Sequence, residues 1–86
     1  MENKELVRAF VTSNFYVANP EALGDGASLL DQGVIDSTGV LEVIMFIEET
    51  FGIVVKDGEM LPDNLDSIDR IANFVARKSA ENVSHA

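Results

Sequence analysis

The chain has 86 residues, 47% of them hydrophobic, which suffices for one domain with a small core but not for a deep substrate cleft as well. Its 15 acidic and 6 basic residues give a formal net charge of −9, which disfavours nucleic acid and favours protein partners with basic patches. The sequence has no cysteine, no apolar run long enough to span a membrane and no signal-peptide pattern at its start, so we expect a cytoplasmic monomer.

The first helical pattern covers about Asn3 to Tyr16. A helix is predicted because three residues are spaced for one face, with Val7, Ala9 and Val17 nearby: Leu6, Phe10 and Ser13. Asn19-Pro20 then ends the helix.

A long connection follows, from Ala18 to Asp36. Gly24–Gly26 marks a loop, and the apolar turn Ser28–Asp31 is expected to pack on the core. Gly33 suits a backbone position with positive φ. Because this connection is long for a helical bundle, and long ordered loops are often functional, we expect it to contribute to a site.

The second helix, from Thr38 to Phe51, has the clearest pattern in the chain. Its apolar residues recur every 3.6 positions and predict one buried stripe made of Val40, Val43, Ile44, Ile47 and Phe51. Gly52 is expected to end the helix.

Three short segments are predicted between the second and the last helix. Ile53–Val55 should be extended, Lys56–Leu61 should form a brief helical turn, and Pro62–Asn64 should form a turn.

The last helix should begin near Asp66 or Ser67 and end at about Lys78, with residues 81–86 frayed. These elements predict an all-α fold, a small antiparallel four-helix bundle with three main helices, one short helix and a long loop between helices 1 and 2. Residues 1–80 should form a single domain.

A second face of the helix over residues 38–51 lies off the core stripe and mixes apolar and acidic residues. It contains Thr38, Leu41, Glu42, Met45 and Glu49, with Glu48 at its border. No basic residue lies between positions 30 and 55 to pair with these carboxylates. The combination suits a docking surface, on which apolar groups make contact and carboxylates steer the partner. Alternatively, the two apolar side chains pack under the long loop.

Ser37 lies directly after Asp36 at the start of this helix and has two interpretations. The pair can be an ordinary N-cap, and Asp66-Ser67 repeats it before the last helix. Ser37 can instead be a point of attachment, which the preceding glycine-containing loop end and the following acidic helix favour.

An enzyme is disfavoured because the sequence lacks a catalytic set of residues. His85, in the polar tail, is the only histidine, and there is no Gly-x-Ser-x-Gly elbow around a serine. Without cysteine there is no thiolate metal site, and Asp25, Asp31 and Asp36 do not have the spacing of a calcium-binding EF-hand loop. We therefore expect no catalytic residue and no metal.

Gly33-Val34-Ile35-Asp36-Ser37, followed in the next helix by Glu42-x5-Glu48-Glu49-x-Phe51, resembles the acyl carrier protein family. The resemblance covers nearly the whole chain: the first helix, the long loop, the serine at the start of the second helix, a short third helix and a final helix. In that family the serine of an Asp-Ser-Leu motif carries 4′-phosphopantetheine.

The resemblance implies that the chain is a non-catalytic carrier of acyl intermediates, held as thioesters on a 4′-phosphopantetheine arm attached to Ser37. Asp36 would help a phosphopantetheinyl transferase to orient the serine and coenzyme A. Leu41, Glu42 and Met45 would lie where the family meets its acyl ligases, synthases and transferases. The apolar bundle core could shelter an acyl chain.

Two neighbouring residues depart from the family pattern, because Thr38 stands where leucine is usual and Gly39 where an acidic residue is common. Glycine costs roughly 1 kcal/mol relative to alanine in a helix interior, so we expect Gly39→Asp to stabilise the helix. The departures also favour a specialised carrier over a housekeeping one. An aminoacyl or D-alanyl carrier protein is one alternative, and an unmodified acidic docking module with Ser37 only as a cap is another.

Overall fold

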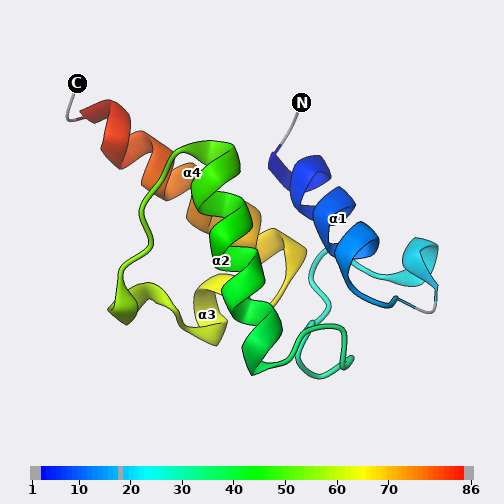
Figure 1. Cartoon of the computed structure of the whole chain (residues 1–86). Coiled ribbons are helices and arrows are strands. Elements are labelled where there is room, and N and C mark those ends of the chain that lie inside the picture. Colours follow the sequence, from blue (N-terminus) through cyan, green and yellow to red (C-terminus); the bar gives the residue numbers. More distant parts are fainter. Residues whose placement is uncertain (1–2, 18, 85–86) are drawn as a thin grey trace.

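A computed structural model describes residues 3–17 and 19–84, and they form an arrangement of helices joined by loops (Figure 1). The helices follow in the order α1 (Asn3–Asn14), α2 (Ser37–Phe51), α3 (Pro62–Leu65) and α4 (Ile68–Ser84). Two single 3₁₀ turns, Pro20–Ala22 and Asp57–Glu59, lie in the connections. The described ranges contain no β-strand. The all-α fold with three main helices, one short helix and a long loop after the first is confirmed.

Helix α4 is the element on which the others pack. Both α1 and α3 lie mainly against it, and α2 crosses in front of it in Figure 1. The apolar stripes of the helices meet in one core, which removes them from water. Its largest fully buried side chains come from the three main helices and the long loop: Val7, Val11, Leu29, Val43, Ile47, Ile68, Ile71, Phe74 and Val75.

On α1 the buried residues are Val7 and Val11, one turn apart. The helix predicted from the spacing of Leu6, Phe10 and Ser13 is found, but Leu6 and Phe10 are only half-buried and Ser13 is exposed. Several apolar residues follow one another on α1, so spacing alone left the centre of its buried face undetermined.

Asp66, just before α4, fixes the long loop. Its backbone carbonyl accepts a hydrogen bond from the N–H of Leu29 at 2.7 Å, and its carboxylate accepts from the N–H of Leu30 at 2.9 Å and the hydroxyl of Ser28 at 2.6 Å. Leu29 is thereby held in the core, as predicted for this turn. The positive φ predicted at Gly33 is also found, at 72°.

Asp25 holds an earlier part of the loop to α1 and to α4. Its carboxylate accepts a hydrogen bond from the guanidinium of Arg8 and lies 3.7 Å from the ammonium of Lys4. Its backbone carbonyl accepts from the N–H of Asp69 at 2.9 Å. The bond from Arg8 is the main reason why the pKa of Asp25 lies below its ordinary value.

The connection from α2 to α4 differs in part from the prediction. Gly52 ends α2 in the left-handed conformation, and Ile53–Val55 is extended, both as predicted. The helical turn predicted over 56–61 is a shorter 3₁₀ turn. Residues 62–65, of which 62–64 were predicted to be a turn, form α3, because the fixed φ of Pro62 suits the first position of a helix.

Helix α4 continues past Lys78, where its end was predicted, to Ser84. Lys78 is 7% exposed, and its ammonium donates to both carboxylate oxygens of Glu59, at 3.0 and 3.2 Å. The backbone N–H of Lys56, and then this ammonium, lower the pKa of Glu59. The fraying predicted for residues 81–86 stays a prediction, and residues 85–86 lie outside the described part. No helix in the described part is long and apolar enough to cross a bilayer.

Candidate functional site

The first turn of α2 exposes the hydroxyl of Ser37. Asp36 is the N-cap, and its Oδ1 accepts a hydrogen bond from the backbone N–H of Gly39 at 2.7 Å. Ser37 is then the first helical residue, and its side chain is exposed. Within residues 3–17 and 19–84, no group hydrogen-bonds to its Oγ. Because the aspartate caps the helix, the serine hydroxyl is left available.

The second Asp-Ser pair has the opposite arrangement. Ser67 is the residue that caps α4, since its Oγ accepts from the N–H of Arg70 at 3.0 Å, and it is only 2% exposed. Asp66 is engaged with the long loop instead. The same dipeptide therefore gives one accessible hydroxyl, at Ser37, and one that is buried and bonded, at Ser67.

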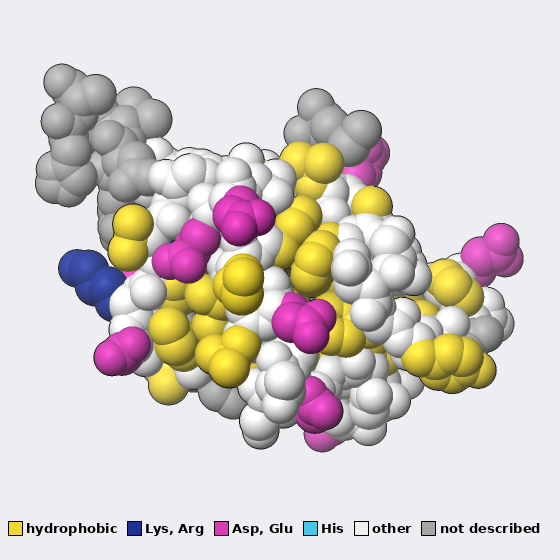
Figure 2. All heavy atoms as spheres, viewed as in Figure 1, with side chains coloured by type: hydrophobic (Ala, Val, Ile, Leu, Met, Phe, Trp, Pro, Cys, Tyr) yellow, Lys and Arg dark blue, Asp and Glu magenta, His cyan; other side chains and the backbone are white. Residues whose placement is uncertain are grey.

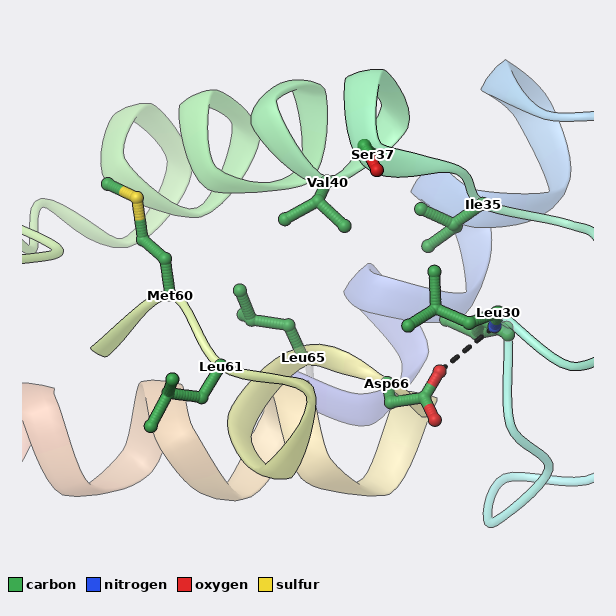
Figure 3. A pocket seen from close by; sticks show the side chains of 9 residues that line it. Leu30, Ile35, Ser37, Val40, Met60, Leu61, Leu65 and Asp66 are labelled. Carbon is green, nitrogen blue, oxygen red and sulfur yellow. Dashed lines mark hydrogen bonds between the residues drawn. The ribbon is translucent and has the colours of Figure 1, made fainter. Parts of the chain in front are cut away.

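An apolar cleft of about 270 Å³ opens beside Ser37 (Figure 3). Its walls come from the long loop, from α2, from the segment leading into α3 and from α3 itself: Leu29, Leu30, Ile35, Val40, Met60, Leu61 and Leu65. Ser37 and Val40 line it from α2, and Leu65 and Leu61 approach from the opposite side. A flexible group attached to Ser37 would start at the edge of this cleft.

Sequence reasoning did not connect Met60, Leu61 and Asp66 with Ser37. Asp66 forms the polar end of the cleft, where it holds Leu30 in place (Figure 3). Two apolar residues before a proline were the only available signal at positions 60 and 61. Their position opposite α2 depends on how α3 packs against α4, which no local pattern shows.

The mixed face predicted on α2 is exposed. Leu41 and Met45 are 55% and 59% exposed, so neither is packed under the long loop. Thr38, Glu42 and Glu49 are exposed as well. Figure 2 shows apolar and acidic side chains intermixed over α2, and the basic side chain in this view lies at the left edge, away from α2.

Glu48 differs from the rest of this set. It is half-buried, and its Oε2 accepts a hydrogen bond from the backbone N–H of Val55 at 3.0 Å. This carboxylate is therefore already used within the molecule, where it fixes the extended segment after α2.

Gly39 does not lie at a surface position where an acidic residue has simply been lost. It is buried, and a Cβ built on it would lie 2.9 Å from Cε1 of Phe15, 3.1 Å from Cγ2 of Ile35 and 3.4 Å from Oδ1 of Asp36. These contacts argue against the expectation that Gly39→Asp stabilises the helix, because the position faces Phe15, next to the end of α1, and not solvent.

The described residues bring neither a histidine nor a metal-ligating cluster to Ser37. His85 lies outside the described residues, and no group of three or more potential metal-ligating side chains gathers anywhere in the described ranges. What the site presents is an accessible hydroxyl, a fixed helix start, an apolar cleft and an acidic helix.

Comparison with known proteins finds two informative relatives. Over 66 residues the chain is 33% identical to the acyl carrier protein 2, mitochondrial, of Arabidopsis thaliana, a match that covers 77% of this chain and 51% of that protein. Over 53 residues it is 30% identical to the D-alanyl carrier protein of Abiotrophia defectiva, covering 62% of this chain and 67% of that protein. The chain thus spans about half the length of the first relative. No protein-family model matches it.

The second of these relatives is 30% identical and is covered over 67% of its length. The two similarities show that the chain belongs to the acyl carrier protein family.

Proposed function

We propose that the chain is a non-catalytic acyl carrier protein and that Ser37 bears its 4′-phosphopantetheine. The observation that carries this proposal is the division of roles in the first turn of α2: Asp36 caps the helix, and the Ser37 hydroxyl remains exposed and unbonded within the described part. When bound, the group would supply the thiol on which an acyl chain is held as a thioester.

The surroundings of Ser37 fit such a group. The positive end of the α2 dipole favours a phosphate at the first helical residue, which offsets the charge of Asp36. Asp36 keeps the turn in one conformation, so a phosphopantetheinyl transferase would meet the serine in a fixed position. The cleft beside Ser37 is open to a flexible arm.

The cargo that fits best is an acyl chain. The cleft is lined mainly by aliphatic side chains, and burial of each methylene contributes about 0.8 kcal/mol. A small aminoacyl group, whose ammonium needs water or a partner, would gain little there. The aliphatic lining therefore favours an acyl carrier over an aminoacyl or D-alanyl carrier.

The exposed face of α2 is the proposed partner surface, used by the transferase and by acyl ligases, synthases or transferases with basic patches. Its members are Thr38, Leu41, Glu42, Met45 and Glu49, with Glu48 contributing through the segment that it fixes. Thr38, which replaces the usual leucine beside the attachment point, is exposed and supports a specialised set of partners. Action as a cytoplasmic monomer is part of the same proposal.

The modification is tested by incubating the chain with a phosphopantetheinyl transferase and coenzyme A and measuring the intact mass. The wild type should gain one phosphopantetheine, Ser37→Ala none, and Ser67→Ala, the matched control that also follows an aspartate, one. Ser67→Ala is scored by mass alone, because it removes the cap of α4 and lowers stability. Full modification of Ser37→Ala would refute the assignment. Unmodified wild type would favour the docking-module alternative.

The cargo is tested by loading the modified chain with acyl groups of increasing length and recording melting curves. The melting temperature should rise with each added methylene until the cleft is filled, and it should not rise with a D-alanyl group. Equal melting temperatures for all cargoes would mean that the cleft does not hold the chain.

A further inference from the structure

A buried ion pair joins the segment between α2 and α3 to the last helix. The ammonium of Lys78, on α4, donates to both carboxylate oxygens of Glu59, at 3.0 and 3.2 Å. Lys78 is only 7% exposed, and Glu59 is half-buried. Because water reaches this pair poorly, the loss of either partner would leave a charge without adequate solvation. The two residues therefore depend on each other for their positions.

Backbone hydrogen bonds inside the segment over residues 56–61 shape it into a compact turn. The N–H groups of Glu59, Met60 and Leu61 donate to carbonyls of the same segment, at 2.9 to 3.3 Å. The carboxylate of Glu59 also accepts from the backbone N–H of Lys56 at 3.0 Å, which closes the turn. The contact of Glu59 with α4 therefore positions this segment as one unit.

Asn64, on α3, makes a second connection between the segment and α4. Its Nδ2 donates to the backbone carbonyl of Glu59 at 2.9 Å, and its Oδ1 accepts from the guanidinium of Arg77 at 2.9 Å. Arg77 is exposed, so water competes for this bond. The connection that is shielded from water is the one made by Lys78, the next residue along α4.

The two residues that follow Glu59 form one wall of the cleft beside Ser37. Met60 and Leu61 line the cleft on the side opposite Val40 of α2 (Figure 3). Met60 is half-buried and Leu61 is 49% exposed, so burial of apolar surface holds this wall only in part. Because the wall begins one residue after an anchored side chain, its position depends on that anchor.

We propose that Glu59 and Lys78 are positioning residues for the cargo, because their ion pair holds Met60 and Leu61 opposite α2 and so sets the width of the cleft. Neither residue touches the cargo; both act through the wall. When the pair is broken, the wall moves away from α2, water enters the cleft, and an acyl chain gains less from burial.

This inference deepens the proposed carrier function and rests on it for the identity of the cargo. The competing explanation is that the pair only stabilises the fold, so the test includes a core truncation of similar cost. Glu59→Gln and Lys78→Met each remove one charge of the pair. Ile71→Ala is the matched control, because Ile71 is fully buried on α4 and does not line the cleft. Truncating such a side chain and breaking a buried ion pair lower stability by comparable amounts.

Amide hydrogen exchange is measured on the full unmodified chain, under conditions in which the variants are folded. The amides of Met60 and Leu61 should exchange about tenfold faster, relative to those of α2, in Glu59→Gln and in Lys78→Met than in the wild type. Ile71→Ala should leave this ratio unchanged. If Lys78→Met does not fold, Glu59→Gln decides the result, because the Glu59 side chain is 28% exposed and water can solvate a glutamine there.

A second measurement uses the phosphopantetheine-modified chain loaded with an octanoyl group. Loading should raise the melting temperature of the wild type. Glu59→Gln should lose about half of that rise, because a displaced wall buries fewer methylenes. Ile71→Ala should keep the full rise, although it melts at a lower temperature.

An unchanged exchange ratio at Met60 and Leu61, or an equal change in Ile71→Ala, would overturn the inference. A full octanoyl-dependent rise in Glu59→Gln would do the same. The exchange experiment does not depend on Ser37. Faster exchange at Met60 and Leu61, together with failure of a transferase to modify the chain, would establish that the ion pair positions the wall and would remove the carrier function.

Discussion

Ser37 and Ser67 both follow an aspartate at the start of a helix, but the side chain that caps the helix differs between them. In α2 the carboxylate of Asp36 accepts the first-turn N–H, and in α4 the hydroxyl of Ser67 does so. Asp66 is not available as a cap because its oxygens hold the long loop. The accessibility of a serine is thus decided by what else its neighbouring aspartate binds.

A substitution at Gly39 tests how tightly the first turn of α2 is packed. Replacing it by alanine should lower the free energy of unfolding by about 1–3 kcal/mol, because the clash with Phe15 and Ile35 exceeds the gain in helix propensity. Gly39→Asp should destabilise further, since it adds a carboxylate beside Asp36. Urea denaturation measures both. A stabilised Gly39→Ala would mean that the ring of Phe15 moves aside easily.

The two faces of α2 have different roles. The inner face of α2 supplies Val43, Ile44 and Ile47 to the core, while Val40 and Ser37 face the cleft. Its outer face presents Leu41 and Met45 to solvent. The fold therefore does not depend on the outer face, and that face is free to contact partners.

This division predicts unequal effects of truncation along α2. Leu41→Ala and Met45→Ala should each change stability by less than about 0.5 kcal/mol, because both side chains are more than half exposed. Ile47→Ala, at a fully buried position, should cost roughly 2–5 kcal/mol. Melting curves of the three variants make the comparison. If all three variants lost similar amounts of stability, the outer face of α2 would be part of the core in solution.

The long loop gives a prediction about pH. The folded-state pKa of Asp25 is lowered, chiefly by the hydrogen bond from Arg8, so its stabilising contribution is present above the ordinary aspartate pKa. That contribution is lost as pH falls through the lowered value. Asp25→Asn should therefore be less stable than wild type at neutral pH, and the difference should shrink in acid.

Denaturant midpoints from neutral pH down to strongly acidic pH measure this difference. Asp31→Asn, an exposed aspartate of the same loop, is the matched control for removing one charge. A difference between Asp25→Asn and wild type that stays constant at every pH would show that the ion pair with Arg8 does not stabilise the loop.

Over the whole molecule, acidic groups outnumber basic ones by 15 to 6, so repulsion remains after every basic residue is paired. Raising sodium chloride from low to moderate concentration should therefore increase the melting temperature, although it also screens the ion pairs of the loop. Each 1 kcal/mol of repulsion relieved corresponds to about 4–8 °C for a domain of this size. An unchanged or lower melting temperature would mean that the ion pairs outweigh the repulsion.

Much of the fold could be predicted from the sequence, and so could the exposed serine proposed as the attachment site, because both depend on local chemistry. Helix α2, its end at Gly52 and the positive φ at Gly33 follow from periodicity and from the conformational freedom of glycine. The family resemblance pointed to Ser37 through residues on a single loop and helix. These features need no knowledge of which elements meet in space.

Only the tertiary structure decided which residues come together from distant parts of the chain. The centre of the buried face of α1 was set by contact with α4, and the role of Gly39 by contact with Phe15. The cleft beside Ser37 needs Met60 and Leu61 on the side opposite α2. The stacking of Phe10 on Phe46 joins α1 to α2. Such contacts depend on the packing of whole helices, whereas a sequence pattern reports only the preferences of neighbouring residues.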